Sequence, residues 1–258
     1  MTDTPVLELQ GVSKSFGAVQ ALFEVDFHVA PGEVMALVGD NGAGKSTLIK
    51  CIAGIHPIDS GEIRFEGRPV TIHGPKDAAD LGIEVVYQDL ALADNLDVVE
   101  NMYLGRELID GIRRLDETTM EAKARETLRS LSVTTISSVR QTVAGLSGGQ
   151  RQSVAVAKAV MWNSKVVILD EPTAALGVAQ TRQVLDLVKR LAEQGLAVLL
   201  ISHNLHDIFE VAHSITVLRL GQNVSEFQTK DVTQTQVVEA ITAGKLSKVP
   251  GQTEEAIA

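Results

Sequence analysis

The sequence has 258 residues, of which 45% are hydrophobic and 22% charged, a composition typical of a folded globular protein. Acidic residues outnumber basic ones by 33 to 23, and the formal net charge of −10 argues against a protein that coats nucleic acid. Cys51 is the single cysteine, so an internal disulfide is excluded and a reducing compartment is favoured. The first residues lack the pattern of a leader, and no apolar run approaches the roughly 18 residues of a membrane span, so we expect a cytoplasmic protein.

The first third of the chain predicts β-strands. Apolar and polar residues alternate over residues 23–29, beginning with Phe23 on the apolar face, which indicates a half-buried strand. Residues 34–38 are all apolar, as expected of a strand buried on both faces. Residues 62–65 and a strand near residues 70–72 flank a Glu-Gly pair, which predicts a hairpin.

The second half predicts alternating helices and strands. Apolar residues from Met120 to Leu131 recur at helical spacing. Residues 166–169 and 197–201 are short apolar runs typical of buried strands, and apolar residues 184–191 between them predict a helix that Gly195 can close. A strand, a helix and a strand in this order predict a parallel sheet.

A phosphate-binding loop is predicted at residues 39–46, which fit the pattern G-x-x-x-x-G-K-[ST] between the strand at 34–38 and a helical stretch at 47–53. Glycines let successive backbone N–H groups surround an anion, and the positive N-terminus of the helix adds to the attraction. Lys45 can reach the β- and γ-phosphates, and the Ser46 hydroxyl can bind Mg²⁺. The alternative is an ordinary glycine-rich turn with a surface lysine.

Two carboxylates end the apolar strand at 166–169. Asp170 is placed to hold Mg²⁺ beside the phosphate loop. Because neighbouring side chains on a strand point to opposite faces, Glu171 is expected to act separately, by orienting or deprotonating the attacking water. A solvated acidic strand end is the alternative.

A second phosphate-binding helix start is predicted at residues 146–150, Leu-Ser-Gly-Gly-Gln, before a helical stretch at 151–162. Ser147 is a suitable N-cap. A cap alone does not explain two consecutive glycines, which lower helix propensity. Exposed helix N–H groups with a hydroxyl can instead bind phosphate.

In this order the motifs resemble the nucleotide-binding domain of ATP-binding cassette (ABC) transporters, over residues 7–221. The resemblance implies an α/β fold: a P-loop NTPase core with a mainly parallel sheet, an N-terminal antiparallel β subdomain and an inserted helical subdomain at about residues 91–162. It implies one ABC ATPase domain over residues 1–258, and we expect residues 245–258 to be a flexible tail.

The resemblance also assigns roles to residues. It implies that Glu171 and His203 are catalytic, that Gln88 joins the metal site and that Phe16 stacks on adenine; a core position is the alternative for Phe16. Cys51 and the other five histidines receive no role, and Cys51 is expected in the core. The implied Mg²⁺ ligands are Ser46, Gln88 and Asp170. The implied ATP-binding residues are Phe16, Gly39, Asn41, Gly42, Ala43, Gly44, Lys45, Ser46, Thr47, Gln88, Ser147, Gly148, Gly149 and Gln150.

Within the family, residues 87–106 and 171–178 resemble ribose-, xylose- and fructose-type sugar importers. The implied protein is an ATP-hydrolysing subunit that forms an ATP-bound homodimer on the cytoplasmic face of the membrane. It would drive a separate membrane permease and depend indirectly on a solute-binding protein. Gly177 stands where the family usually has an aspartate, which puts communication between the two sites of the dimer in question.

Three alternatives remain open from the sequence. One is an ABC importer for another small solute. The second is a soluble ABC ATPase acting on chromosomes or ribosomes, which the acidic charge and the absence of a coiled-coil insertion or charged linker disfavour. The third is a small-molecule kinase, which leaves residues 146–150 and His203 unexplained and would not consume ATP without an acceptor.

Overall fold

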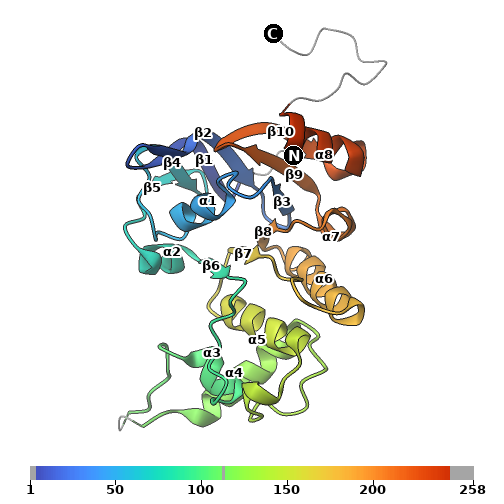
Figure 1. The fold of residues 1–258 in the computed structure, drawn as a ribbon. Coiled ribbons are helices and arrows are strands. Elements are labelled where there is room, and N and C mark those ends of the chain that lie inside the picture. Colours follow the sequence, from blue (N-terminus) through green and yellow to red (C-terminus); the bar gives the residue numbers. More distant parts are fainter. Residues whose placement is uncertain (1–3, 112–113, 245–258) are drawn as a thin grey trace.

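The protein, seen here as a computed structural model, consists of two β-sheets and a helical lobe, and the structure describes residues 4–111 and 114–244 (Figure 1). The tail predicted at residues 245–258 lies outside the described residues. The strands are β1 (Leu7–Phe16), β2 (Val19–Val29), β3 (Val34–Val38), β4 (Ser60–Phe65), β5 (Arg68–Val70), β6 (Ile83–Val86), β7 (Val166–Asp170), β8 (Ala197–Ile201), β9 (Ser214–Arg219) and β10 (Gln222–Gln228). The helices are α1 (Lys45–Ile52), α2 (Pro75–Leu81), α3 (Val98–Tyr103), α4 (Glu117–Ser130), α5 (Gly148–Val160), α6 (Val178–Glu193), α7 (Leu205–Val211) and α8 (Gln234–Ala243), with 3₁₀ turns η1 (Val143–Gly145) and η2 (Thr229–Asp231).

The N-terminal sheet is antiparallel, with strand order β2-β1-β4-β5, and confirms the predicted hairpin at Glu66-Gly67. The prediction for Phe23 was wrong: its side chain is 39% exposed, and Leu22 is buried in its place. The cause is a break in the pairing of β1 with β2, where Glu24 has a φ of 46° and the register shifts. A bulge of this kind reverses the faces of the residues on one side of it.

The larger sheet has six strands in the order β10-β9-β3-β8-β7-β6. All neighbours from β9 to β6 are parallel, whereas β10 returns antiparallel beside β9. This confirms the predicted parallel βαβ unit, in which α6 connects β7 to β8. It also confirms the P-loop core with an antiparallel β subdomain.

Side-chain alternation in β3 explains how both faces of the larger sheet are buried. Met35 and Leu37 pack with the antiparallel sheet and α1, in a core that also contains the buried Cys51. Ala36 and Val38 point to the other face, toward α7 and α8. Further along that face, strands β7 and β8 pack against α5 and α6.

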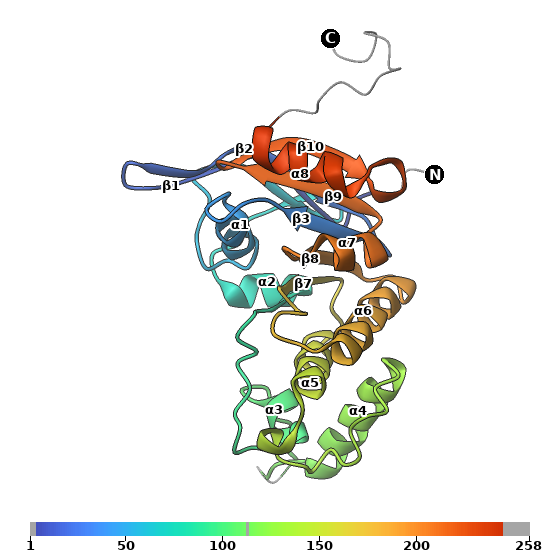
Figure 2. The same ribbon diagram turned by 45° about the vertical axis from the view of Figure 1, so that its right-hand side comes forward.

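The helical lobe, formed by α3, α4, η1 and α5, extends from one side of the larger sheet in both views, and α5 joins it to that sheet (Figures 1 and 2). Its helices share one apolar core, to which α4 contributes Met120, Ala124 and Leu128. Arg140 bonds to three carboxylates, those of Asp97, Glu117 and Glu121, and so ties the start of α3 to α4. Within residues 4–111 and 114–244, no helix is long and apolar enough to cross a membrane.

Three predicted element boundaries shift. The helix after the phosphate loop begins at Lys45 and ends at Ile52, because the glycine before Lys45 serves as its N-cap. The helix predicted from residue 151 begins at Gly148, so that its two glycines form the first turn. The strand expected near residues 70–72 is β5, which ends at Val70.

Candidate functional site

Three chain segments with functional candidates meet at one edge of the larger sheet. Leu37 of β3 pairs with Ile201 of β8, and Ile201 pairs with Asp170 of β7. Because these strands are parallel, the phosphate loop, Glu171 and His203 all follow strand ends at the same level. The carboxyl edge of a parallel sheet is the usual ligand-binding edge of such folds.

The phosphate loop is held by contacts that only glycine allows. A Cβ atom on Gly39 would lie 2.1 Å from the carbonyl oxygen of Leu218, and one on Gly44 would lie 2.8 Å from that of Ala21. Both glycines also have positive φ angles, 154° and 105°. Neighbouring strands therefore fix the path of the loop, which leads directly into the N-terminus of α1.

Lys45 lies over its own loop: its ammonium donates hydrogen bonds to the carbonyl oxygens of Gly39, at 2.6 Å, and Asp40, at 3.0 Å. Burial lowers the pKa of Lys45, although the charges of Glu171, Asp40 and Asp170 oppose this. Burial raises the pKa of Asp170, with a further contribution from Glu171, while Lys45 and Lys50 counteract it. The Lys45 ammonium and the Asp170 carboxylate are thus both partly desolvated, and their mutual attraction does not fully offset the cost of burial. This is expected at a site where a bound ligand supplies the compensating charge.

Glu171 and His203 form a pair. The Nδ1 atom of His203 lies 2.8 Å from the Oε2 atom of Glu171, and the side chain of Glu171 is 17% exposed whereas that of His203 is 79% exposed. Glu171 lies beyond the end of β7, with a φ of 52°, and its backbone N–H donates to the carbonyl oxygen of Ile201. Glu171 therefore lies outside the strand, and the alternation of side chains from which its separate role was predicted does not apply to it. Its separate role stays a prediction.

Gln88 is exposed in the loop after β6. Val86 pairs with Leu169 of β7, so this loop begins beside Asp170. Sequence reasoning missed Tyr87, whose pKa is raised by burial and by the charge of Asp170. Tyr87, the first residue after β6, is therefore a neighbour of Asp170. No pattern in the sequence indicated this.

The segment at residues 146–150 starts α5 as predicted. The Ser147 hydroxyl accepts a hydrogen bond from the N–H of Gln150, and the Gln150 side chain accepts one from the N–H of Ser147, a capping box that confirms the predicted N-cap. The two glycines also have a packing role, because a Cβ atom on Gly148 would lie 2.9 Å from Leu176, and one on Gly149 3.2 Å from Gln180. The start of α5 thus packs against the segment that precedes and begins α6.

Phe16 lies at the end of β1 and is 43% exposed, so it is not a core residue. Its ring makes an edge contact with His56, with centroids 5.0 Å apart, and the Lys14 ammonium lies 5.5 Å from its centroid. Lys14 is held by Asp59 at 2.7 Å. Sequence reasoning gave His56 no role, since its contact with Phe16 depends on the antiparallel sheet meeting the end of α1.

The residues fit Mg²⁺ that is bound together with a nucleotide. Within the described parts of the chain, no cluster of three His, Cys, Asp or Glu side chains could hold a metal ion. Mg²⁺ typically takes one or two carboxylates and completes its shell with water and substrate phosphates. Asp170, the Ser46 hydroxyl and the Gln88 amide provide oxygen donors of this kind near the phosphate loop.

The desolvated Asp170 makes a testable contribution to stability. We expect Asp170→Asn to raise the free energy of unfolding of the nucleotide-free protein at pH 7, by roughly 0.5–2 kcal/mol, the range of common stabilising substitutions. Because the pKa of Asp170 is higher in the folded than in the unfolded chain, its ionisation lowers the stability of the folded protein at pH values above the folded pKa. This cost disappears as the pH falls to 3.8, the ordinary pKa of an aspartate. Denaturant unfolding at several pH values measures it, and a variant less stable than the wild type at pH 7 would contradict the assignment.

Comparison with known proteins shows the family to which the chain is related. Residues 22–174 match the family model described as ABC transporter. The chain is 47% identical to a fructose import ATP-binding protein of Rhizobium meliloti, covering 95% of this chain and 96% of that protein. It is 45% identical to a xylose/arabinose import ATP-binding protein of Sulfolobus acidocaldarius, again over 95% and 96%. It is 42% identical to a ribose import ATP-binding protein of Streptomyces avermitilis, of which it spans 48%.

Solved structures agree with this placement. A nucleotide-free ATP-binding cassette from an ABC transporter superposes with a TM-score of 0.80 at 25% identity, over 93% of this chain and 96% of that one. A cassette in its ADP conformation superposes with a TM-score of 0.79 at 26% identity, over 93% and 95%. The chain belongs to the family of ABC transporter ATP-binding proteins. As a member of this family it binds ATP and hydrolyses it.

Proposed function

We propose that this chain is the ATP-hydrolysing subunit of a monosaccharide importer. The observation that carries the hydrolytic part is the Glu171–His203 pair, 2.8 Å apart, at the same sheet edge as Lys45 and Asp170. The sugar specificity is supported by the fructose, xylose/arabinose and ribose import proteins that the chain resembles at 42–47% identity. No residue of the site bears on the sugar itself.

In the proposed reaction, the phosphate loop and Lys45 bind the phosphates of ATP, and Phe16 stacks on the adenine. The Glu171 carboxylate orients the attacking water and accepts its proton. His203, bonded to Glu171, holds the carboxylate in place and lies close to the γ-phosphate. Ser46, Gln88 and Asp170 would hold Mg²⁺, which would neutralise negative charge on the phosphates of ATP.

A second copy of the chain is proposed to complete each site. In both views α5, which begins at Gly148, lies in the helical lobe, whereas α1, which begins at Lys45, lies against the antiparallel sheet (Figure 2). Ser147 of one copy is therefore proposed to face the phosphate held by the other copy, giving a two-fold dimer with two equivalent nucleotides. ATP favours this closed dimer because it binds the closed form better than the open one.

Closure of the dimer is proposed to drive a membrane permease at the cytoplasmic face. The segment after Gln88 leads from the metal ligands into the helical lobe, so its position can depend on the nucleotide. Asn101 is fully buried and accepts from the N–H of Ala93, while its amide donates to the carbonyls of Ala93, Leu96 and Asp97. These bonds fix the conformation of the segment, so that its movement can be transmitted to a permease helix that docks on it.

The coupling surface gives a prediction. We expect Asn95→Arg, at an exposed position of this segment, to abolish most transport while leaving basal ATPase largely unchanged, because a bulky charge blocks docking without touching the nucleotide site. Glu126→Arg, on the exposed face of α4, is the matched control and should affect neither activity. A variant at Asn95 that transports normally would remove this segment from the proposed interface.

The experiment that tests the function is reconstitution of the chain with its co-purifying membrane and solute-binding proteins in vesicles. We expect uptake of a labelled pentose or hexose that requires ATP, and no effect of free sugar on the ATPase of the isolated chain. Stimulation of the isolated chain by sugar would contradict the separate recognition of sugar outside the membrane. Uptake of a different nutrient by the same complex would contradict the sugar assignment and leave the importer assignment standing.

A further inference from the structure

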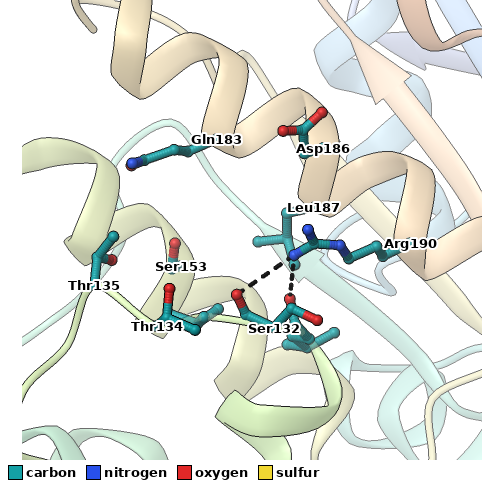
Figure 3. A pocket seen from close by; sticks show the side chains of 10 residues that line it. Ser132, Thr134, Thr135, Ser153, Gln183, Asp186, Leu187 and Arg190 are labelled. Atoms are coloured by element: carbon teal, nitrogen blue, oxygen red, sulfur yellow. Dashed lines mark hydrogen bonds between the residues drawn. The ribbon is translucent and has the colours of Figure 1, made fainter.

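Helix α6 reaches across to the C-terminal end of α4 in the helical lobe. The Nη1 atom of Arg190 donates to the carbonyl oxygen of Leu131 at 2.9 Å and to that of Ser132 at 3.4 Å (Figure 3). One turn further along, Gln194 donates to the carbonyl oxygen of Ser130 at 2.9 Å. These carbonyls belong to the end of a helix, where no intrahelical donors remain for them. Arg190 and Gln194 therefore satisfy the end of α4 from another part of the molecule.

The end of α4 has a conformation that requires such support. The N–H of Val133 donates to the carbonyl of Leu128, and that of Ser132 to Arg129, both at 2.8 Å, which is a Schellman motif. Ser132 stands at the left-handed position, with a φ of 52°, where glycine is usual. A non-glycine residue persists in this conformation only when its surroundings hold it. Arg190, bonded to the Ser132 carbonyl, is one such contact.

The same loop continues to the start of α5. The carbonyl of Thr135 accepts a hydrogen bond of 2.5 Å from the side-chain amide of Gln150, and the other end of that amide accepts from the N–H of Ser147 at 2.8 Å. The Gln150 side chain thus connects the loop to the residue that caps α5. A shift of the loop away from α6 would change the position of Gln150 and, through it, that of Ser147.

A cavity of about 180 Å³ lies between the loop and α6, lined by residues that include Ser153, Gln183, Asp186 and Arg190 (Figure 3). Beyond the buried contact of Leu131 and Leu187, most of the lining side chains are polar. The loop at residues 132–135 therefore depends on polar contacts more than the core beneath it does. The bonds of Arg190 are such contacts.

We infer that Arg190 is a positioning residue for Ser147: it holds the loop after α4 against α6, and this loop, through Gln150, supports the residue that caps α5. The inference rests on the proposed function, in which Ser147 faces the nucleotide of a second copy. Helix α6 follows the turn that contains Glu171, so Arg190 links the segment after the catalytic carboxylate to the segment that completes the partner site. Arg190 itself touches neither nucleotide nor Glu171.

The test compares Arg190→Ala with Lys189→Ala. Lys189 is the preceding residue of the same helix, and its ammonium bonds instead to Glu210 of α7 at 2.9 Å. Hydrogen exchange of the nucleotide-free chain is followed at residues 133–135 and 147–151, and ATP binding and steady-state ATPase are measured separately. We expect faster exchange at both segments in Arg190→Ala alone, with ATP affinity unchanged and kcat lowered roughly ten- to a hundredfold, the effect of a small misplacement outside the reacting atoms. Arg190→Lys keeps the charge and one bond, and should recover part of the lost kcat.

Unchanged exchange at residues 147–151 in Arg190→Ala would overturn the inference, and so would faster exchange with a normal kcat. If Arg190→Ala does not fold, Arg190→Lys and Gln194→Ala, which removes the neighbouring bond, decide the same question. A wild-type chain without ATPase would defeat the proposed function, whereas the exchange measurement would still decide whether Arg190 orders the start of α5. The two failures are therefore distinguishable.

Discussion

Replacing Glu171 with glutamine is expected to leave ATP binding intact and to lower kcat by roughly 10²–10⁴, the usual effect of removing a general base. Glutamine has the same shape and tolerates the left-handed backbone at this position about as well as glutamate, so the turn after β7 should persist. The amide can still bond to His203 but cannot accept a proton from water. Single-turnover ATPase together with equilibrium ATP binding measures both effects.

The matched control for this variant is Glu193→Gln, an exposed carboxylate at the end of α6, which should retain normal turnover. Wild-type-like kcat in purified Glu171→Gln would remove Glu171 from the role of base. The His203→Ala variant tests whether His203 acts by holding Glu171. If it does, the double variant with both substitutions should have a kcat little lower than that of Glu171→Gln alone, since the two residues then act as one unit.

Replacing Lys45 with alanine is expected to weaken ATP binding itself. Lys45 is the cation of the phosphate loop, and its ammonium bonds to two carbonyls of that loop, from which it can turn to the phosphates. A hydrogen bond to a charged group is worth about 1.5–3 kcal/mol, so the Kd for ATP should rise roughly ten- to a hundredfold. Calorimetric titration with ATP measures this.

Lys50→Ala is the control for Lys45→Ala, because Lys50 is exposed on the same helix and also acts electrostatically on Asp170. An equal loss of affinity in both variants would mean that general positive charge and not the position of Lys45 binds the phosphates.

The local structures around the candidate site that the sequence predicted correctly are those encoded by adjacent residues. The phosphate loop, the N-cap at Ser147 and the strands that end at Asp170 and Ile201 each depend on a few adjacent residues with strong conformational preferences. The parallel order of β3, β8 and β7 follows from the strand–helix–strand pattern and brings these segments to one edge.

The parts that were missed depend on contacts between distant segments. The outward turn of Phe23 follows from a break in pairing with β1, and the contact of His56 with Phe16 needs α1 to end beside the antiparallel sheet. The left-handed φ of Glu171 is stabilised by a bond to Ile201, more than two dozen residues later in the chain. Arg190 belongs to no sequence motif, and its bond to the end of α4 is visible only in the folded structure. No periodicity in a single sequence reports such contacts.

If two copies of the chain complete each ATP site, residues of different copies can be crosslinked across that site. Cys51 is buried and its pKa is raised to about 11, so introduced cysteines can react without interference from it. Two proteins are prepared in the Glu171→Gln background, one with Asn41→Cys in the phosphate loop and one with Ser147→Cys, and they are mixed with ATP, Mg²⁺ and a short thiol crosslinker. We expect a product of twice the chain mass that requires both proteins and ATP. Crosslinking that is independent of ATP, or no product although both proteins bind ATP, would contradict it.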